Sequence, residues 1–297
     1  MMRPLKQNSY CSSQKSPNVV LTEPPTKDLG SYFNMFLQDF CCYTVFQTAN
    51  HNSELFTVSS QELRRLLCYR DPSFLHYGFV QHINEVVATL IKHGRAFIEV
   101  ITEKDESSNL VGISFRLIQN RSARRVGSCI QFKSCTFGNA STTFWIPESS
   151  LIILNLKDLS FSRGYFVRLF RKIQRIELPL NMMGIKNFDI TKYSAIADKK
   201  MLRLNKRTFW YGRNSSNQYL SEAYLLYHVM NFRMLQWKFL EYVIVSYNKA
   251  LSKIEEQVGS LGQINIDPKR PDYGLYWDQL QKGELNFEQF GNHLYRV

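Results

Sequence analysis

The sequence lacks the paired cysteines, glycine-rich turns and histidine clusters that mark most metal sites and many catalytic sites. None of the six cysteines belongs to a C-x-x-C pair, and the six histidines are scattered along the chain. There is no P-loop, no dinucleotide-binding glycine turn, no nucleophile elbow and no His-Glu zinc helix. We therefore expect a protein without metal, cofactor or catalytic site, one that works by binding.

Long apolar runs are missing as well. A membrane-spanning helix needs about 18 or more consecutive apolar residues, and no segment of the chain reaches that length. The stretch from Met1 to Val20 has no apolar core of the kind found in secretory signals. The sequence therefore predicts no membrane span, a cytoplasmic location, and cysteines that are buried and reduced.

The charge of the chain is strongly unbalanced. The 37 lysines and arginines outnumber 25 acids, which gives a formal net charge of +12. Such an excess favours association with nucleic acid, anionic lipid or an acidic partner. Between Arg163 and Arg213, 13 cationic residues accompany only three acids. Nucleic acid, and DNA in particular, is the partner that we expect.

Hydrophobic spacing divides the chain into three parts. Residues 1–29 resemble a basic, disordered leader, residues 30–160 an α+β domain, and residues 161–297 a basic, mainly helical region. Apolar residues at three- and four-residue steps predict N-terminal helices, most clearly over 75–93. After Gly94 the pattern predicts a hairpin and three further strands, at 96–101, 110–118, 128–132, 142–146 and 151–156. Helices followed by strands indicate an α+β fold with a central, mainly antiparallel sheet.

The longest regular pattern lies near the C-terminus. A capping box at Ser215-x-x-Gln218 begins a predicted helix over 216–258, and no proline or glycine interrupts it before Gly259. At 1.5 Å per residue such a helix would be about 60 Å long. Its apolar residues cover a wide face, so it requires burial within its own domain or against neighbouring subunits. Two helices joined by a tight kink are the alternative.

A cationic stripe is predicted just after residue 160. Four residues recur at three- and four-residue spacing and share one face of a helix: Arg168, Arg171, Lys172 and Arg175. Another face carries Leu169, Ile173 and Ile176. The stripe, together with Arg163, can contact several phosphates at once, although an ordinary solvated helix face has the same pattern.

A second basic group interleaves cations with aromatic residues. Lys206, Arg207 and Arg213 surround Trp210 and Tyr211, which suits phosphate contact combined with base stacking. For the aromatic residues we favour a packed turn over a stacking site. A smaller basic cluster is expected in the loop after the hairpin, formed by Arg121, Arg124 and Arg125.

One group of residues has the composition of a metal-dependent nuclease site. Glu99, Glu103 and Lys104 combine acids with a lysine around the predicted hairpin. A solvated turn has the same composition, so geometry has to decide between the two interpretations.

One stretch is similar to a segment of tailed-phage portal proteins. His93–Val100 ends a helix in a Gly-x-Ala-aromatic strand, and Asn109–Ile113 follows a charged turn. Further on, Ile146-Pro147-Glu148 precedes an apolar strand at 151–156, as in that family. The resemblance covers residues 75–156. It implies a ring-shaped homo-oligomer through which DNA is packaged, with long helices in the stem and a location in the virion.

Three classes of function remain open at this point. We expect a non-enzymatic, DNA-associated assembly protein, in its most specific form a portal-like ring component. A nucleic-acid-binding protein of replication or regulation, acting as monomer or dimer, is the alternative. A metal-dependent nuclease is the third class.

Overall fold

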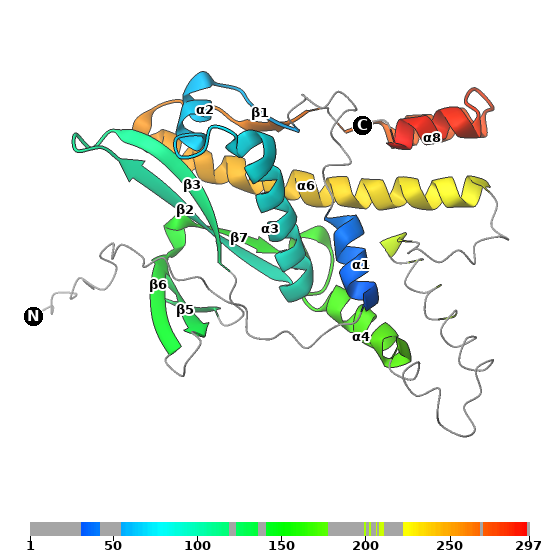
Figure 1. Cartoon of the computed structure of the whole chain (residues 1–297), viewed down its shortest axis with the longest axis horizontal. Helices are drawn as coiled ribbons and strands as arrows, with labels where there is room; N and C mark the ends of the chain where they lie inside the picture. The colour runs from blue at the N-terminus through cyan, green and yellow to red at the C-terminus, as the bar shows by residue number, and fades with distance from the viewer. Residues whose placement is uncertain are drawn as a thin grey trace, which may run out of the picture.

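The chain adopts an α+β fold, as the sequence predicts (Figure 1). The computed structural model describes residues 31–41, 55–118, 123–135, 141–177, 199, 202, 206, 208–210, 222–267 and 270–295. The predicted leader, residues 1–29, lies outside these ranges.

A three-stranded antiparallel sheet occupies the centre of the fold. β2 (Arg95–Lys104) lies between β3 (Leu110–Ile118) and β7 (Leu151–Asn155) and pairs with both. The turn between β2 and β3 is closed by Asp105, whose carboxylate accepts a hydrogen bond from the Asn109 backbone N–H at 2.7 Å. The predicted hairpin is therefore confirmed.

A second antiparallel sheet contains β4 (Ala123–Val126), β5 (Cys129–Cys135) and β6 (Ser141–Pro147), in that order. The prediction of a mainly antiparallel block over residues 95–156 is confirmed. The prediction that Arg124 and Arg125 lie in a loop is wrong, because both lie on β4. A strand of four residues with two adjacent arginines has no apolar alternation by which to detect it.

Alternate residues of the central sheet belong to two different cores. Ile98 and Ile152 point into the larger core, which the helices cover, whereas Phe97 and Leu151 point into a smaller one. The smaller core is completed by the inward residues of the second sheet, Ile130, Phe132 and Ile146. The central sheet is thus covered on both faces, because successive side chains of a strand point to opposite sides.

The helix α3 (Phe79–His93) lies against the central sheet (Figure 1), and its buried apolar side chains belong to the larger core. A π-helical turn over Phe74–Gly78 precedes it, so the regular helix begins later than the predicted residue 75. Gly94 ends the helix in a left-handed conformation (φ 70°), as expected of a glycine C-cap. Five further α-helices have their bounds in the described ranges: α1 (Ser31–Phe40), α2 (Gln61–Leu67), α4 (Tyr165–Glu177), α7 (Tyr273–Gln281) and α8 (Phe287–Tyr295).

The helix α6 (Glu222–Val258) has 37 residues and is unbroken, which at 1.5 Å per residue is about 55 Å. The long helix is therefore confirmed without a kink, while its predicted first turn, 216–221, lies outside the described residues. Its buried side includes Trp237, Leu240 and Tyr247, all at most 1% exposed. The core of the protein itself therefore covers one face of α6.

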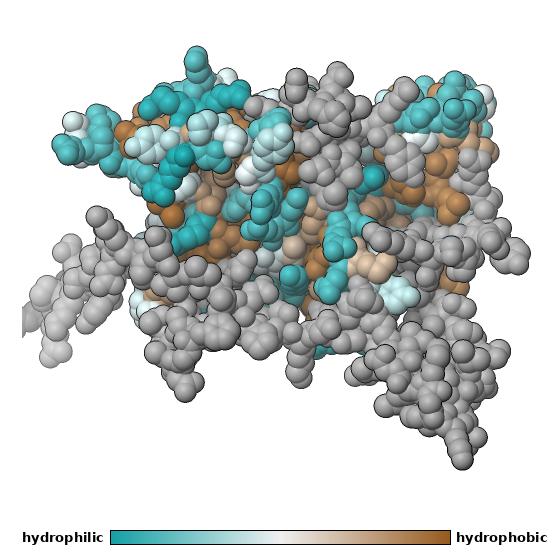
Figure 2. Space-filling model, in the orientation of Figure 1, coloured by the Kyte–Doolittle hydropathy of each residue, from teal (hydrophilic) through white to brown (hydrophobic). Residues whose placement is uncertain are grey.

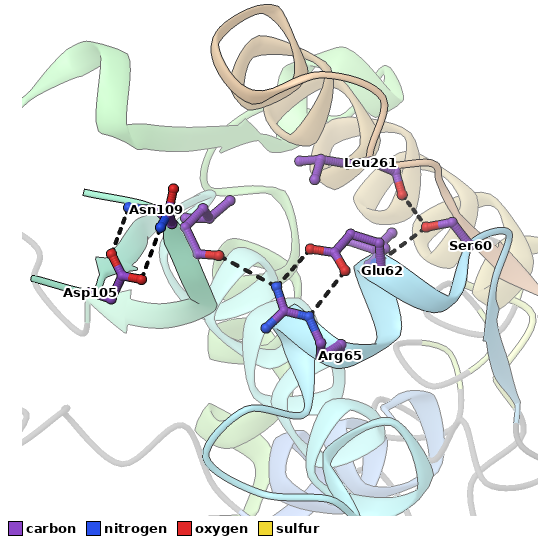
Figure 3. Close-up of polar contacts among 8 residues, drawn as sticks. Ser60, Glu62, Arg65, Asp105, Asn109 and Leu261 are labelled. Atoms are coloured by element: carbon purple, nitrogen blue, oxygen red, sulfur yellow. Dashed lines mark hydrogen bonds and ion pairs between the residues drawn. The ribbon is translucent and has the colours of Figure 1, made fainter. Parts of the chain in front are cut away.

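Segments far apart in the sequence pair with each other near both ends of the described chain. β1 (Phe56–Val58) pairs with β8 (Ile264–Ile266), and the Ser60 side chain that caps α2 also donates a hydrogen bond to the Leu261 carbonyl (Figure 3). Arg65, one turn into α2, binds Glu62. The larger core likewise combines residues from both sides of position 160.

The cysteines differ in oxidation state. Cys41 and Cys68 are reduced, as expected. Cys129 takes part in a disulfide bond, so the prediction of a reduced thiol is wrong for this residue. Within the described part of the chain, no helix is both long and apolar enough to cross a membrane.

Candidate nucleic-acid interface

Helix α4 has an apolar face and, opposite it, a basic face. Phe166 and Phe170 are fully buried, and the Phe170 ring centroid lies 4.9 Å from those of Phe33 and Phe36 on α1. These contacts hold the helix with its other face towards solvent.

The exposed face of α4 carries Arg168 and Arg171. Neither guanidinium forms an ion pair with any residue that the structure describes. Of the predicted apolar face, Leu169 is half-buried against the core, and Phe166 and Phe170 provide the deepest contacts. Ile173 and Ile176 have side chains outside the described set.

The start of α4 is joined tightly to the end of α3. A Cβ at Gly94 would lie 2.0 Å from the Arg163 carbonyl oxygen, so only glycine allows this approach. The Arg163 side chain donates from Nε to the His93 carbonyl oxygen at 3.5 Å, and Arg168 donates to the Ser162 hydroxyl. Arg163 therefore has a structural role at the helix end, where a cation is also favoured by the helix dipole.

This junction brings together cations from five separate elements. The backbone N–H of Leu156 binds the Gly94 carbonyl at 3.1 Å, which places η5 (Leu156–Leu159) beside the end of α3. Lys238 of α6 reaches the same turn, with Nζ 3.4 Å from the Leu159 carbonyl oxygen. We name the resulting group the junction cluster; its members are Lys92, Arg95, Lys157, Arg163, Arg168, Arg171 and Lys238.

The junction cluster contains little negative charge. Asp158 is the one acid in the segments 92–95, 157–171 and 238 that supply the seven cations. Its carboxylate accepts a hydrogen bond from the Tyr242 hydroxyl at 2.6 Å. Burial, together with this bond, raises the pKa of Tyr242, so the hydroxyl stays protonated and acts as the donor. A strong positive surplus therefore remains around the end of α3.

Of the other predicted site residues, Lys206 alone has a side chain that the structure describes. Lys172 and Arg175 lie on α4, but their side chains are outside the described set. Lys206 is exposed, and Arg207 and Arg213 lie outside the described residues.

Trp210 belongs to the core and does not form a stacking surface. It is 3% exposed, its ring lies edge-on to Phe36, and its Nε1 donates to the Asp39 carboxylate at 2.8 Å. The favoured interpretation of a packed aromatic turn is therefore confirmed for this residue. Tyr211 lies outside the described residues.

The acids of the nuclease-like group are engaged in separate ion pairs. Glu99 pairs with Arg116, and Glu103 pairs with Arg70 at 2.7 Å. Among the described residues, no group of three or more histidine, cysteine, aspartate or glutamate side chains could hold a metal ion. This arrangement favours a structural role for the two glutamates.

A half-buried histidine with a lowered pKa, His82, lies at the edge of the larger core. His82 contacts the Tyr247 hydroxyl through Nε2 at 2.7 Å, and its ring stacks on Phe79. Burial lowers the pKa of His82 to about 4 and raises that of Tyr247. Both side chains are therefore neutral near pH 7 and form a neutral hydrogen bond at the edge of the core.

Comparison with known proteins leaves the function open. No model of a known protein family matches the chain, and no curated protein is similar to it at a significant level. The similarity to portal proteins over residues 75–156 therefore stays a prediction.

Four members of the junction cluster were not identified from the sequence: Lys92, Arg95, Lys157 and Lys238. Each is an isolated cation in its own segment. Only the contacts between α3, η5, α4 and α6 bring them near Arg163 and Arg168, so no local signal could have identified them.

Proposed function

We propose that this protein is a non-enzymatic, DNA-associated assembly protein, and that its form is a portal-like ring. The junction cluster is the single observation that carries the DNA part of the proposal. Seven cations accompany one acid there, and Arg168 and Arg171 have no acidic partner among the described residues. Cations that neutralise phosphates release condensed counterions, which drives binding to DNA irrespective of sequence.

Helix α6 supports the assembly part of the proposal. Four large apolar side chains on it are exposed: Tyr227 at 38%, Met234 at 36%, Val245 at 66% and Val258 at 44%. Figure 2 shows hydrophobic surface along the half of α6 nearest α8. An apolar surface on the longest helix would be covered in a complex of several copies. The ring itself is the form that the resemblance to portal proteins implies.

Duplex binding at different salt concentrations tests the DNA part. Replacing Arg168 and Arg171 by glutamine removes two phosphate contacts. This should weaken binding to all duplex sequences and flatten the plot of log affinity against log salt by about 0.9 per lost contact. The matched control replaces Lys249 and Lys253, two exposed lysines near the far end of α6, and removes the same charge. Equal effects of the two variants would show that net charge alone matters and would overturn this assignment.

Light scattering on the full chain tests the assembly part. We expect several copies per particle, and we expect Met234→Ser combined with Val245→Ser to reduce that number. A monomer at every concentration would refute the ring and leave a DNA-binding monomer, the alternative class. Unchanged copy number in the double variant would show that α6 is not the contact surface.

A further inference from the structure

The outward face of the β4–β5–β6 sheet carries an ordered row of polar and aromatic side chains. Arg124 on β4 lies opposite Gln131 on β5, and Gln131 lies opposite Trp145 on β6. Residues that pair directly across strands point to the same face of a sheet. Their sequence neighbours Ile130, Phe132 and Ile146 point to the opposite face and are buried in the smaller core. The row therefore faces away from that core.

Trp145 differs from the other tryptophans of the protein. It is 44% exposed, whereas Trp210 and Trp237 are 3% and 1% exposed and Trp277 is half-buried in the larger core. A large ring usually contributes to stability by being buried. The burial of Ile146 beside it shows that β6 already contributes to the smaller core without Trp145. The exposed ring is thus available to a ligand.

The same sheet has positive charge and no acid. The strands β4, β5 and β6 contain Arg124, Arg125 and Lys133 but no aspartate or glutamate. Arg125 is paired with Glu148 at 2.8 Å, at the edge of the sheet. Arg124 has no acidic partner among the described residues. Lys133, two residues after Gln131, extends the positive charge on the outward face.

We propose that this face binds single-stranded nucleic acid, which is a second site beyond the proposed function. An unpaired base would stack on Trp145, Gln131 would meet its polar edge, and Arg124 and Lys133 would contact the flanking phosphates. Neighbouring strands are about 4.8 Å apart, so Arg124 and Trp145 lie about 10 Å apart across two strand spacings. That span suits one nucleotide with its phosphates.

Stacking on Trp145 requires a base that is free of the double helix. In a duplex, the faces of the bases are covered by their neighbours, so a base can stack on Trp145 only after it has left the double helix. Sites for single strands combine cationic side chains with aromatic rings on which bases stack, and they are tolerant of sequence. The junction cluster has cations but no exposed aromatic ring among its members, so the two sites differ in chemistry.

Binding of a labelled oligo(dT) of about 12 nucleotides tests the proposal. Trp145→Ala should weaken this binding about 5- to 150-fold, which corresponds to the measured range for one stacked base. Trp145→Phe should retain most of the affinity, because it keeps an aromatic ring. Val126→Ala is the matched control, since Val126 is an exposed apolar residue on β4 that lacks an aromatic ring. Unchanged binding by Trp145→Ala would overturn the proposal.

A change in the nucleic acid tests stacking independently of the protein variants. A deoxyribose-phosphate chain of equal length without bases keeps the charges and removes stacking. It should bind the parent protein as weakly as oligo(dT) binds Trp145→Ala. Arg124→Gln should flatten the salt dependence by about 0.7 per lost phosphate contact. Equal binding of the chain without bases and oligo(dT) would show that stacking plays no part.

Tryptophan fluorescence provides a measurement on the unaltered protein. Oligo(dT) should quench the emission of the parent protein and leave that of Trp145→Phe nearly unchanged. Absence of quenching at saturation would refute stacking on Trp145. Duplex binding should be unaffected by Trp145→Ala, and oligo(dT) binding should be unaffected by the Arg168 and Arg171 replacements. Loss of both ligands in Trp145→Ala would contradict a separate single-strand site.

Discussion

The two faces of the β3–β2–β7 sheet are covered in different ways. On one face, α3 and α6 build a core that contains residues from both halves of the chain. On the other face, the second core contains six buried residues in the described part of the chain, with Ala123, Phe144 and Ile153 packed against them. The first core includes large fully buried side chains such as Phe79, Trp237 and Tyr247, whereas the second depends chiefly on Phe97 and Phe132.

The larger core therefore stabilises the fold, whereas the smaller core supports a sheet with one face open to solvent. The deep core joins segments far apart in the sequence, so its loss should unfold the whole protein. The small core only attaches a three-stranded sheet, whose outer face carries Trp145 and Arg124. A sheet held by few contacts can keep one face free for a ligand while the deep core maintains the fold.

The largest effect is expected from Phe79→Ala. The Phe79 ring is fully buried and contacts Phe56, Phe115 and Tyr247, with ring centroids 4.9, 6.3 and 5.7 Å away. Truncation leaves a cavity and should lower the free energy of unfolding by about 3–5 kcal/mol. Urea denaturation measures this change, and Phe79→Leu should lose clearly less because it refills most of the volume. A loss below about 1 kcal/mol would contradict a deep core at this position.

An effect of intermediate size is expected from acidification. In the folded protein the pKa of His82 is about 4, against 6.5 for the free side chain, so the unfolded chain binds the proton first. The free energy of unfolding should therefore fall as the pH drops from 6.5 towards 4. The total loss is about 3 kcal/mol, at about 1.4 kcal/mol per pH unit between the two pKa values.

The variant His82→Gln isolates this contribution. It can still bond with the Tyr247 hydroxyl but cannot take up a proton, so its stability should depend less on pH between 4 and 6.5. Urea midpoints at several pH values measure the difference. Parallel pH profiles for the parent and the variant would mean that His82 does not couple stability to pH.

The smallest global effect is expected from Phe132→Ala in the second core. Its ring packs against Phe97 and Phe144, with centroids 5.3 Å away in both cases. Because few contacts attach the second sheet, it should open locally before the whole protein unfolds. Amide exchange in β4, β5 and β6 should become about 10- to 100-fold faster, a change of about 1.5–3 kcal/mol. Equal acceleration in α3 would show that the two cores unfold together.

Much of the fold could be predicted from hydrophobic spacing. The helix before Gly94, the hairpin after it and the long helix ending at Val258 all follow local patterns, and the structure contains each of them. Such patterns are visible because the period of apolar residues differs between helices and strands. The strand β4 was missed, since four residues with two arginines show neither period.

Candidate sites were harder to predict, because most of them combine residues from several segments and local spacing reports on one segment only. The exposed face of α4 is a property of one helix, so the spacing of Arg168 and Arg171 was sufficient to identify it. The sequence favoured a packed turn at Trp210 but could not name its partners, Phe36 and Asp39, of which Asp39 is 171 residues away in the sequence. The row of Arg124, Gln131 and Trp145 required the register of three strands.

The sequence by itself determined the α+β class, the order of the main elements and the positive charge of the region after residue 160. Only the tertiary structure decided how the strands of residues 95–156 divide between two sheets and which cations meet at the end of α3. Local periodicity reports which face of a segment is apolar, but it does not report which other segment covers that face. That choice depends on long-range pairing and packing, as the close contact between Gly94 and Arg163 illustrates.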